Sequence, residues 1–558
     1  MSRTVPCLTS AALALTVCCC FGIGAEDPLR PAAEQPTAGP VIRRAADGEG
    51  QVSDENAELV ASLRAVIICQ ESAAGLARQR GASGVVVCGE FSGPEAAAVT
   101  AAGAPFLGQP VSLASLDSLS AAVTRALERR GGPVLRAGFP DQEITGGTVV
   151  LQVVPAVAGR VAVRGTQAFG RDFLDAAWSV KPGAALLHSA VQSDLDWLNE
   201  NPLRRVTAAF APGPDERSFD VLLDVEAKKP WRAYAGMDNS LSDRLGDERW
   251  FAGWQYGDVF GRDHRFSLMA TASLDYDSLH GASLLYEAPL AWRHLLEFSA
   301  GVSESQSVEG AGLSLVDRNG LFRRTGLRYR VPFAAGGEWR GEWFGGASFR
   351  DHEYEFMLTS RSVQMFQLES GCRLRRQTGR AASEVTASLH WSPGGIGSGD
   401  EDYQALGADG AESFILRLLA QHSISPGGGH GLNFRVDAQW SDSHLLASDQ
   451  FAPAINGRLR GFDEVTGYGD SGISGSVEYL TPPWRPRGAG TLRGVVFVDG
   501  AIVHDRRDGV TDSFAAAGCG FRWQRGDISA SCDLGIPLSA PDGVEEDARL
   551  RFSVTTRF

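Results

Sequence analysis

The last eleven residues, Ala548 to Phe558, read ARLRFSVTTRF and alternate in character along their whole length. One face carries Leu550, Phe552, Val554, Thr556 and Phe558, and the other carries Arg549, Arg551, Ser553, Thr555 and Arg557. A period of two predicts a β-strand. Apolar side chains on one face and charged ones on the other indicate lipid outside and water inside. Such a strand would also suit the edge of a soluble sandwich, so the rest of the chain must decide.

The composition argues against a membrane protein that spans the bilayer with helices. Charged residues make up 21% of the 558, which is too polar for a helical membrane protein. Past the extreme N-terminus no apolar stretch reaches the roughly 18 to 20 residues that a spanning helix needs. A membrane assignment therefore requires strands. The net charge of −15 argues against a nucleic-acid partner.

The N-terminus has the features of a secretory signal peptide over residues 1–25. Arg3 supplies the positive charge, Ala11 to Phe21 is the apolar stretch, and Gly22 to Ala25 offers small residues for cleavage. Lipidation at Cys18 is a weaker alternative, because Val17 is large for the position before the cysteine. Residues 26–62 are rich in Pro, Ala and acidic side chains and are predicted to form a flexible lead.

Two small α/β units are predicted next, over residues 63–157 and 158–229. The first has strand-like segments at 63–68, 84–87 and 148–154. It also has a helix that Ser115 would cap, with one apolar face made of Leu116, Leu119, Val123 and Leu127. The second reads as strand, helix, helix, strand, strand. Both units therefore resemble a βααββ arrangement.

From residue 230 to the end, alternating segments are divided by turn signals. In the C-terminal part long connections, at 393–412, 445–472, 504–512 and 537–547, alternate with short ones at 425–429 and 525–526. A transmembrane barrel with short turns on one side and long loops on the other gives this pattern. About 330 residues at about 20 per strand and connection make roughly 16 strands. The predicted fold is mainly β, a transmembrane barrel of about 16 antiparallel strands behind two small α/β domains.

This order of parts resembles the two-partner secretion transporters of the ShlB/FhaC/HecB type, the hemolysin secretion/activation proteins. They belong to a superfamily of POTRA-bearing outer-membrane barrels. In the first unit, Pro140, Gln142 and Ile144 followed by Gly147 resemble the family's P-x-Q-x-I and glycine. In the second, Leu198, Asn199, Asn201 and Pro202 resemble its L-N-x-N-P. Asp238-Asn239 resembles the D-N that enters the first barrel strand, and a terminal aromatic such as Phe558 resembles the family's assembly signal.

The two most specific motifs lie near the C-terminus. Leu459-Arg460-Gly461-Phe462 resembles the V-R-G-[YF] motif of the sixth outer loop, and Phe497-Val498-Asp499 resembles the F-x-D-x-G motif of a barrel strand. Counting back from Phe558 places the loop 445–472 between the eleventh and twelfth of sixteen strands. Two departures are Leu459 in place of Val, and Ala501 where the family has Gly after Gly500. The second departure puts the local backbone of that strand in doubt.

The resemblance implies that this loop occupies the pore and that Arg460 meets Asp499. On the strand around residue 499, alternation directs Phe497 and Asp499 to the lumen and Val496 and Val498 to lipid. A carboxylate in a narrow lumen is costly to desolvate, and an arginine would satisfy it with two parallel hydrogen bonds. The alternative is an exposed turn arginine and an aspartate bonded to neighbouring strands.

No catalytic, metal or cofactor site is expected. Gly427 to Gly429 reads as a turn, because no phosphate-loop Lys-Ser/Thr follows, and no Gly-x-Ser-x-Gly elbow is present. The ten histidines show no metal-ligand spacing. Asp400 to Asp402 would suit Ca²⁺, but a solvated acidic loop is the better interpretation.

By resemblance, the chain would reside in the outer membrane with its two POTRA units in the periplasm. It would export a large secreted partner protein through the barrel and would not be an enzyme. Its other partners would be outer-membrane lipid and, during biogenesis, the barrel assembly machinery. The alternatives are an assembly factor (insertase) of the same superfamily and, less favoured, a diffusion porin or a barrel-borne esterase.

The cysteines give a prediction of strand register. If Arg525-Gly526 is a two-residue hairpin turn, then Cys519 lies opposite Cys532 on the lipid face. Cys69 and Cys88 in the first unit are another possible pair, whose register the sequence leaves open.

Overall fold

The computed structural model describes residues 42–44 and 58–558, with gaps at 80, 129–133, 145, 166–168, 214–217, 227–228, 242–247, 312–313, 335–337, 357–358, 455–458, 464–466 and 545–546. The predicted signal peptide and most of the predicted lead lie outside the described residues. The described chain divides into two compact units, Pro40–Lys228 and Lys229–Phe558. Within these described ranges, no helix combines the length and apolarity needed to span a bilayer.

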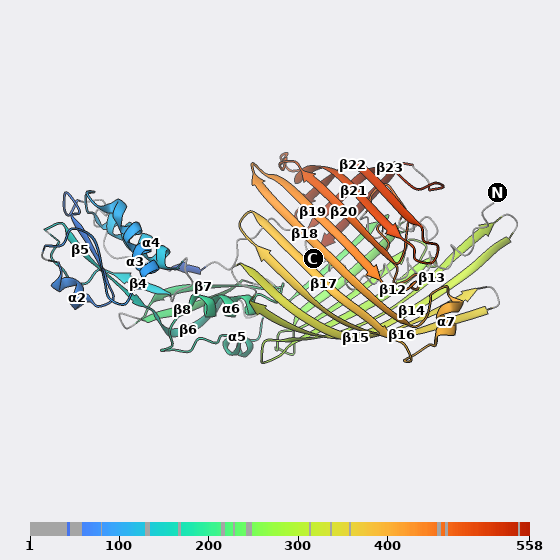
Figure 1. Cartoon of the computed structure of the whole chain (residues 1–558), viewed down its shortest axis with the longest axis horizontal. Helices are drawn as coiled ribbons and strands as arrows, with labels where there is room; N and C mark the ends of the chain where they lie inside the picture. Colours follow the sequence, from blue (N-terminus) through green and yellow to red (C-terminus); the bar gives the residue numbers. More distant parts are fainter. Residues whose placement is uncertain are drawn as a thin grey trace. The chain divides into compact units, whose positions relative to one another are not determined.

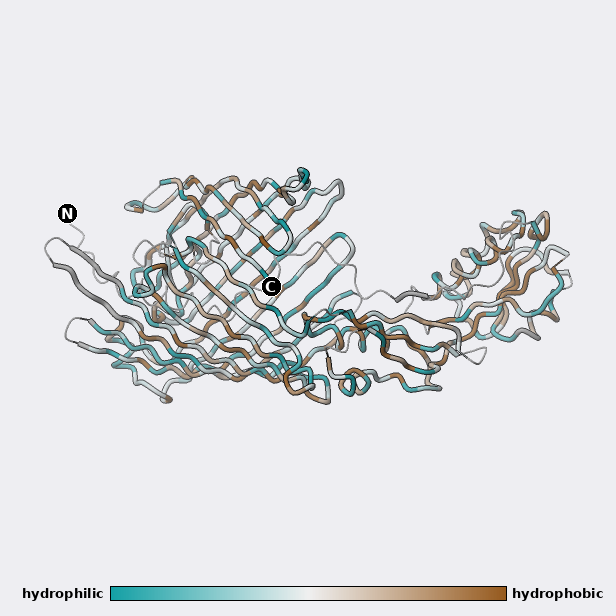
Figure 2. Tube along the Cα trace, turned by 180° about the vertical axis from the view of Figure 1, so that it is seen from behind, coloured by the Kyte–Doolittle hydropathy of each residue, from teal (hydrophilic) through white to brown (hydrophobic). Residues whose placement is uncertain are grey.

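The first α/β domain is a four-stranded sheet in the order β3-β2-β5-β4. Its strands are β2 (Ala65–Cys69), β3 (Gly84–Cys88), β4 (Leu135–Gly138) and β5 (Thr148–Pro155), and its helices are α2 (Ser72–Ala77), α3 (Gly93–Gly103), η1 (Ala104–Phe106) and α4 (Leu113–Glu128). Strand β2 is central, parallel to both β3 and β5. Its apolar side chains are buried against the helices, and Figure 2 shows this strongly hydrophobic centre.

Helix α4 buries the apolar face that its spacing predicts, since Leu119, Val123 and Leu127 lie in the domain core. Its predicted cap is wrong. The helix begins at Leu113, and Ser112 precedes it. The Ser112 N–H donates to Ser115 Oγ (2.8 Å), and the Ser115 N–H donates to Ser112 Oγ (3.2 Å). This reciprocal pair resembles a capping box, so Ser115 is the third helical residue.

The second α/β domain has the predicted order of strand, helix, helix, strand, strand. These elements are β6 (Val157–Gly165), α5 (Arg171–Ala177), α6 (His188–Leu198), β7 (Arg205–Pro212) and β8 (Ser218–Glu226). The sheet order is β1-β7-β8-β6. Its additional strand, β1 (Ile42–Arg44), comes from the segment that was predicted to be a flexible lead and pairs in parallel with β7. Sequence reasoning missed this strand, because three residues are too short for a periodic pattern.

The C-terminal unit is a closed barrel of sixteen strands, which confirms the predicted fold (Figure 1). They are β9 (Trp231–Asp238), β10 (Arg249–Val259), β11 (His264–Ser273), β12 (Leu279–Pro289), β13 (Leu295–Ala311), β14 (Ser314–Ala334), β15 (Trp339–Phe356), β16 (Thr359–Gln377), β17 (Ala381–Pro393), β18 (Glu412–Gly427), β19 (His430–Ser441), β20 (Ser471–Leu480), β21 (Thr491–His504), β22 (Thr511–Arg525), β23 (Ile528–Ser539) and β24 (Arg549–Arg557). All pairings within the barrel, including that of β24 with β9, are antiparallel.

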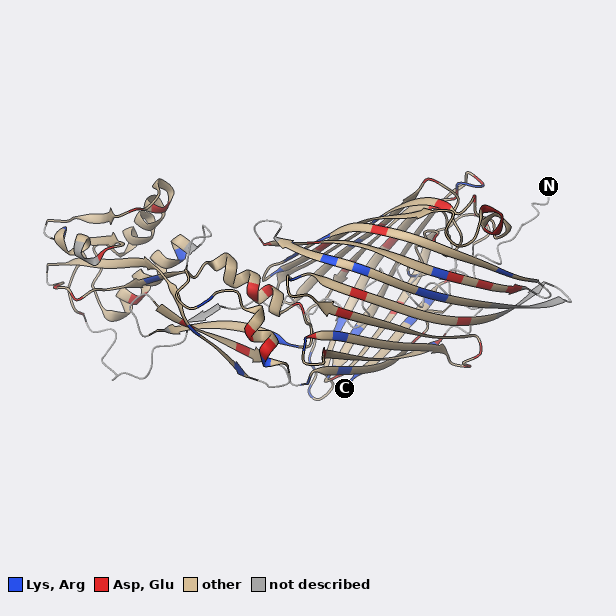
Figure 3. Cartoon of the chain, turned by 90° about the horizontal axis from the view of Figure 1, so that it is seen from below, with Lys and Arg blue, Asp and Glu red and all other residues tan. Residues whose placement is uncertain are grey.

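Strand β21 shows how the wall is built. Val496, Val498 and Ile502 are 54%, 55% and 51% exposed on the outer face, whereas Phe497 and Asp499 are each 1% exposed on the inner face. The alternation predicted for this strand is confirmed. Acidic and basic residues recur along the barrel strands, and Figure 3 shows both signs on neighbouring strands. Many of them pair across the inner wall, as Arg328 does with Glu369 (2.6 Å) and Arg330 with Glu287 (2.9 Å).

Long and short connections alternate in the C-terminal part as predicted, except that 481–490, on the end with the short turns, is longer than 505–510 on the other end. The longer ones include residues 394–411 and 442–470, and the latter lies between the eleventh strand, β19, and the twelfth, β20. The loop 394–411 contains an unpredicted helix, α7 (Asp400–Ala405), and Asp400 to Asp402 form its first turn. The Asp400 carboxylate accepts the Ala411 N–H, and that of Asp402 accepts the Gly399 N–H. These contacts give the acidic triplet a local structural role.

The predicted register of the hairpin between β22 and β23 is wrong by two residues. The turn is Gly526-Asp527, so Cys519 faces Leu534, and Cys532 faces Phe521. Gly526 takes a φ of 57°, which suits the first central position of a type II′ turn. A shift of two residues keeps every side chain on its predicted face. Both cysteines are free.

The seam that closes the barrel corrects another prediction. Asp238 is the last residue of β9, so the Asp238-Asn239 motif follows the first barrel strand and does not enter it. The Asn239 side chain reaches the closing strand instead. Its Nδ2 donates to the Leu550 carbonyl (2.7 Å), and its Oδ1 accepts the Phe552 N–H (2.7 Å). The amide thus extends the short β9–β24 ladder by one side chain.

Candidate functional site: a loop held against the inner barrel wall

The structure brings Arg460 and Asp499 together. Arg460 Nε donates to one carboxylate oxygen (2.8 Å) and Nη2 to the other (2.9 Å), the two-bond arrangement that favours arginine over lysine. The backbone N–H of Arg460 donates to the same carboxylate (3.0 Å). Both residues are buried. Arg460 comes from the loop 442–470 and Asp499 from β21, so the contact fixes the loop to the wall.

A wider charge network surrounds this pair. Arg460 Nη1 donates to Glu478 on β20 (2.8 Å) and lies 3.5 Å from Asp533 on β23. Arg522 on β22 binds both of these acids, at 3.2 Å and 2.5 Å. The guanidinium carbon of Arg460 also lies 3.4 Å from the ring centroid of Phe497, which is a cation–π contact.

Two glycines allow the loop to approach the wall this closely. Gly461 takes a φ of 103°, a conformation that residues with a Cβ rarely adopt. Gly535 on β23 lies directly beneath it. A Cβ at Gly535 would lie 2.4 Å from the Gly461 nitrogen and 2.6 Å from the Arg460 carbonyl carbon. The absence of side chains on both sides therefore brings the two backbones together.

Apolar packing holds the residues on either side of Arg460. Leu459 and Phe462 are buried in a cluster whose wall members include Ala501 and Phe514, and the Phe462 and Phe514 rings meet edge to face at 5.5 Å. Arg551 on the closing strand donates to the Phe462 carbonyl (2.7 Å). The loop motif is thus bound on its apolar side as well as its charged side.

The departures from the family motif have local explanations. Strand β21 keeps an unbroken register with β20 and β22 through Asp499, Gly500 and Ala501, so its backbone is regular. The Ala501 side chain lies in the same apolar cluster as Phe462. Leu459 fills a position of no solvent exposure in that cluster. Leu459 is larger than the family's Val, and Ala501 adds a methyl group where the family has Gly. Both side chains pack into the same apolar cluster.

Sequence reasoning missed the acids that share Arg460. Glu478 and Asp533 lie on the polar faces of alternating strands, so each could be assigned to the lumen by its position. Their convergence on one arginine depends on the register of four strands. No local pattern reveals that register.

A second polar group lies where the loop 442–470 meets its neighbours. His444, Asp470 and Asp505 place one ligand-type atom each within 4.8 Å of one another. His444 Nδ1 bonds Asp470 Oδ2 (2.9 Å), and Asp470 also accepts the N–H groups of Leu445 and Arg506. The hydrogen bond to Asp470 is the main reason that the pKa of His444 lies above its usual value of 6.5. The long sequence separations concealed this group from a search for ligand spacing.

The motif of the first α/β domain organises its own sheet. Gln142 uses its side-chain amide to pair with β5, donating to the Val150 carbonyl (2.8 Å) and accepting the Val150 N–H (2.6 Å). Ile144 packs against the core. Gly147 takes a φ of 69°, and a Cβ there would lie 2.6 Å from the Ser62 carbonyl oxygen. Pro140 precedes this turn, two residues before Gln142.

The motif of the second domain ties the end of α6 to β7. Asn199 Nδ2 donates to the carbonyls of Leu195 (2.8 Å) and Val206 (2.9 Å), and its Oδ1 accepts the Val206 N–H (2.7 Å). Leu198 is buried in the core, and its carbonyl accepts from Arg204 Nε (2.8 Å). Asn201 accepts the Leu203 N–H across the bend that contains Pro202. These residues lie apart from Arg460 in sequence and belong to the other unit.

Among the described residues, Cys69, Cys88 and Cys372 are also free. Cys69 and Cys88 lie directly opposite each other on the parallel strands β2 and β3, both buried. Burial raises the pKa of the Cys69 thiol, and the nearby Cys88 adds to the effect.

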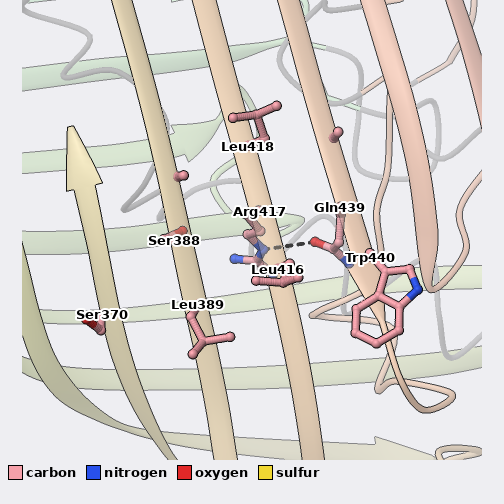
Figure 4. Close-up of a pocket in the computed structure, with 10 residues that line it drawn as sticks. Ser370, Ser388, Leu389, Leu416, Arg417, Leu418, Gln439 and Trp440 are labelled. Carbon is pink, nitrogen blue, oxygen red and sulfur yellow. Dashed lines mark hydrogen bonds between the residues drawn. The ribbon is translucent and has the colours of Figure 1, made fainter. Parts of the chain in front are cut away.

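A hollow on the barrel surface is separate from the loop. Leu389, Leu416, Leu418 and Trp440 border it on the outer face, with Arg417 and Gln439 behind them (Figure 4). Arg417 Nε donates to Gln439 Oε1 (2.9 Å). The apolar border indicates a wall that faces lipid.

A barrel with an arginine-bearing loop held inside it, preceded by small α/β domains, defines a class of outer-membrane transporter. The family model of haemolysin secretion/activation protein ShlB/FhaC/HecB matches residues 218–523, and that of the ShlB-type POTRA domain matches residues 82–156. The chain belongs to the ShlB/FhaC/HecB family. It is therefore an outer-membrane β-barrel protein with periplasmic POTRA domains.

Relatives agree with this assignment. The outer membrane transporter CdiB of Escherichia coli O6:K15:H31 (strain 536 / UPEC) is 23% identical over 478 residues, which cover 80% of this chain and 76% of that protein. The solved structure of CdiB from Escherichia coli has a TM-score of 0.67 at 17% identity and covers 91% of this chain and 93% of its own. That of CdiB from Acinetobacter baumannii has a TM-score of 0.66 at 14% identity and covers 100% of both. At these identities, the two solved structures show that the chain shares their fold.

Proposed function

We propose that this protein exports a large secreted partner protein through its barrel, after the POTRA domains receive the partner in the periplasm. The observation that carries the proposal is the arginine loop bound to the inner wall through Arg460 and Asp499, in a chain of this transporter family. The roles of the motif residues are part of the proposal. Leu459, Arg460, Gly461 and Phe462 form the pore loop, and Phe497 and Asp499 form its seat on the wall.

The secreted partner would bind to the edge strands of the two POTRA sheets. An extended segment can join an exposed strand through main-chain hydrogen bonds. In the described sheets, β3 and β4 are the edge strands of the first sheet, and β1 and β6 are those of the second. Strand β3 (GVVVC) is rich in β-branched residues and so suits such an addition. The motifs around Gln142 and Asn199 would act by holding these sheets in shape.

Export would not require catalysis by the chain. Folding of the partner outside the cell would supply direction, and movement of the loop would open the path. The C-terminal Phe558 would serve during assembly of the barrel, and outer-membrane lipid would contact the outer face. An assembly factor of the same superfamily is the alternative function.

The test uses the full-length chain in cells with a large secreted protein encoded beside its gene. We expect the partner in the medium only when the transporter is present, and its accumulation in the periplasm otherwise. If the partner reaches the medium without the transporter, and other outer-membrane barrels fail to assemble in its absence, the assembly-factor alternative is correct and the export proposal is wrong.

A further inference from the structure

The first half of the loop has an anchor of its own. Asp449 accepts a hydrogen bond from Arg350 Nη1 on β15 (2.6 Å), and this pair is deeply buried, at 2% and 5% exposure. Gln439 on β19 donates to the Asp449 carbonyl (2.8 Å), and Arg417 on β18 lies 3.8 Å from the carboxylate. None of these residues belongs to a motif that the sequence singled out.

This anchor lies on a different part of the wall from Arg460. Arg350 is on β15 and Asp499 on β21, six strands apart in a closed barrel of sixteen. Between the two anchors the loop stays close to the wall, since Phe451 and Ala454 lie in the same apolar cluster as Leu459 and Phe462. The loop is therefore attached at two places along the inner wall, one at β15 and one at β21.

Neighbouring apolar contacts support the attachment at Asp449 and Arg350. Leu446 packs in an apolar cluster with Val363 and Met365 of β16 and Tyr403 of α7. Apolar packing thus flanks the Asp449 pair as the Phe462 cluster flanks Arg460. The polarity of the two ion pairs is opposite, since the loop supplies the acid at Arg350 and the base at Asp499.

We propose that Asp449 and Arg350 form a second latch, which holds the loop 442–470 against the inner wall together with Arg460 and Asp499. Arg350 and Asp449 are positioning residues. Release of one latch lets the loop pivot about the other, and release of both frees the passage. The inference deepens the proposed function, because it names a further device that controls the same pore.

Planar-bilayer conductance of the purified full-length protein tests the latch without any partner. We expect Asp449→Asn and Arg350→Gln each to raise the open-state population by about tenfold, because each removes the buried ion pair between the loop and β15. The double variant should conduct little more than either single variant, since both substitutions break the same latch. Asp449→Asn combined with Arg460→Gln should open the channel further than either single variant.

Two further variants keep the result interpretable. Asp449→Glu retains the charge and should keep most of the low conductance. Asp508→Asn removes an exposed acid from the loop between β21 and β22 and should behave as wild type. Heat-modifiable mobility on gels reports whether each barrel is folded. The second latch is wrong if folded Asp449→Asn and Arg350→Gln conduct like wild type and add nothing to the conductance of Arg460→Gln. Since conductance needs no partner, a failure of the export proposal would leave this result unchanged.

Discussion

At Arg460, one side chain serves three acids. Asp499, Glu478 and Asp533 all lie within 3.5 Å of its guanidinium, and Arg522 shares two of them. Two arginines therefore face three carboxylates on the inner wall. Loss of either arginine would leave acids close together without enough compensating charge, so the loop and the wall depend on each other for their charge balance.

A double-mutant cycle measures this dependence. Arg460→Ala and Asp499→Ala should each impair export and lower the unfolding temperature of the barrel, because breaking a buried pair typically costs about 3 to 5 kcal/mol. The double variant should be little worse than either single one. Export of the partner and the heat-modifiability midpoint should be measured together. Strictly additive defects would show that the two residues act independently.

Gly535 tests the fit of the loop without changing any charge. In Gly535→Ala the new methyl would lie 2.4 Å from the Gly461 nitrogen, so the loop backbone must move away from β23. Such overpacking typically costs about 1 to 3 kcal/mol. We expect higher conductance from a folded barrel.

Gly500→Ala is the matched control for that variant, because a Cβ at Gly500 would meet nothing closer than 3.6 Å. It should retain wild-type conductance. Equal conductance in the Gly535 and Gly500 variants would mean that the close approach of the two backbones does not hold the loop.

At the scale of elements, the barrel seam is its shortest ladder. Strands β24 and β9 pair at five positions, whereas β23 and β24 pair at eight. Asn239 adds two hydrogen bonds next to this ladder. Asn239→Ala should lower the heat-modifiability midpoint, because it removes bonds whose loss typically costs about 1 to 3 kcal/mol. Asn239→Asp keeps an acceptor for Phe552 but loses the donor to Leu550, so it should be intermediate. A midpoint that is unchanged in both variants would contradict this role.

Strand faces could be read from the sequence, but strand register could not. The alternation of β21 assigns Asp499 to the lumen, because a side chain's face depends only on the parity of its position. The hairpin at Gly526-Asp527 shows the limit, since a shift of two residues preserves every face, and hydrophobic pattern cannot detect it.

The same limit explains what was missed at the site. The Arg460–Asp499 pair could be proposed because family motifs mark both residues. Arg350 and Asp449 are 99 residues apart, and they meet only because the loop after β19 folds back onto the inner face of β15. Strand β1 was missed for a related reason, since its pairing with β7 depends on contacts distant in sequence.

At the scale of the whole molecule, the loop should respond to pH through His444. Its pKa is raised mainly by the bond to Asp470, with contributions from Asp505 and Asp409 that burial opposes. A raised folded-state pKa means that this stabilisation is complete below about pH 6.5 and is lost as pH rises through the higher value. Burial would raise the pKa of Asp470, but His444 and the N–H groups of Leu445 and Arg506 lower it. Its contribution is therefore lost only in strong acid.

We expect protease cleavage within the loop 442–470 to increase between pH 6 and pH 9. His444→Gln should remove most of that increase, because glutamine does not titrate. The same pH dependence in wild type and His444→Gln would show that another group controls the loop.

Removal of the loop tests its place in the transporter as a whole. A deletion of residues 457–469 takes out Arg460 and Phe462 but leaves Asp449 and the strands β19 and β20. The barrel should still insert, because its strands pair with one another and not through the loop. Without the anchor between Arg460 and Asp499 the lumen should open, so conductance should rise. Export should fall, because Asp499 would lose its partner and the remaining loop its fixed position. Unchanged conductance together with normal export, in a deletion that inserts well, would show that the loop neither closes the pore nor takes part in export.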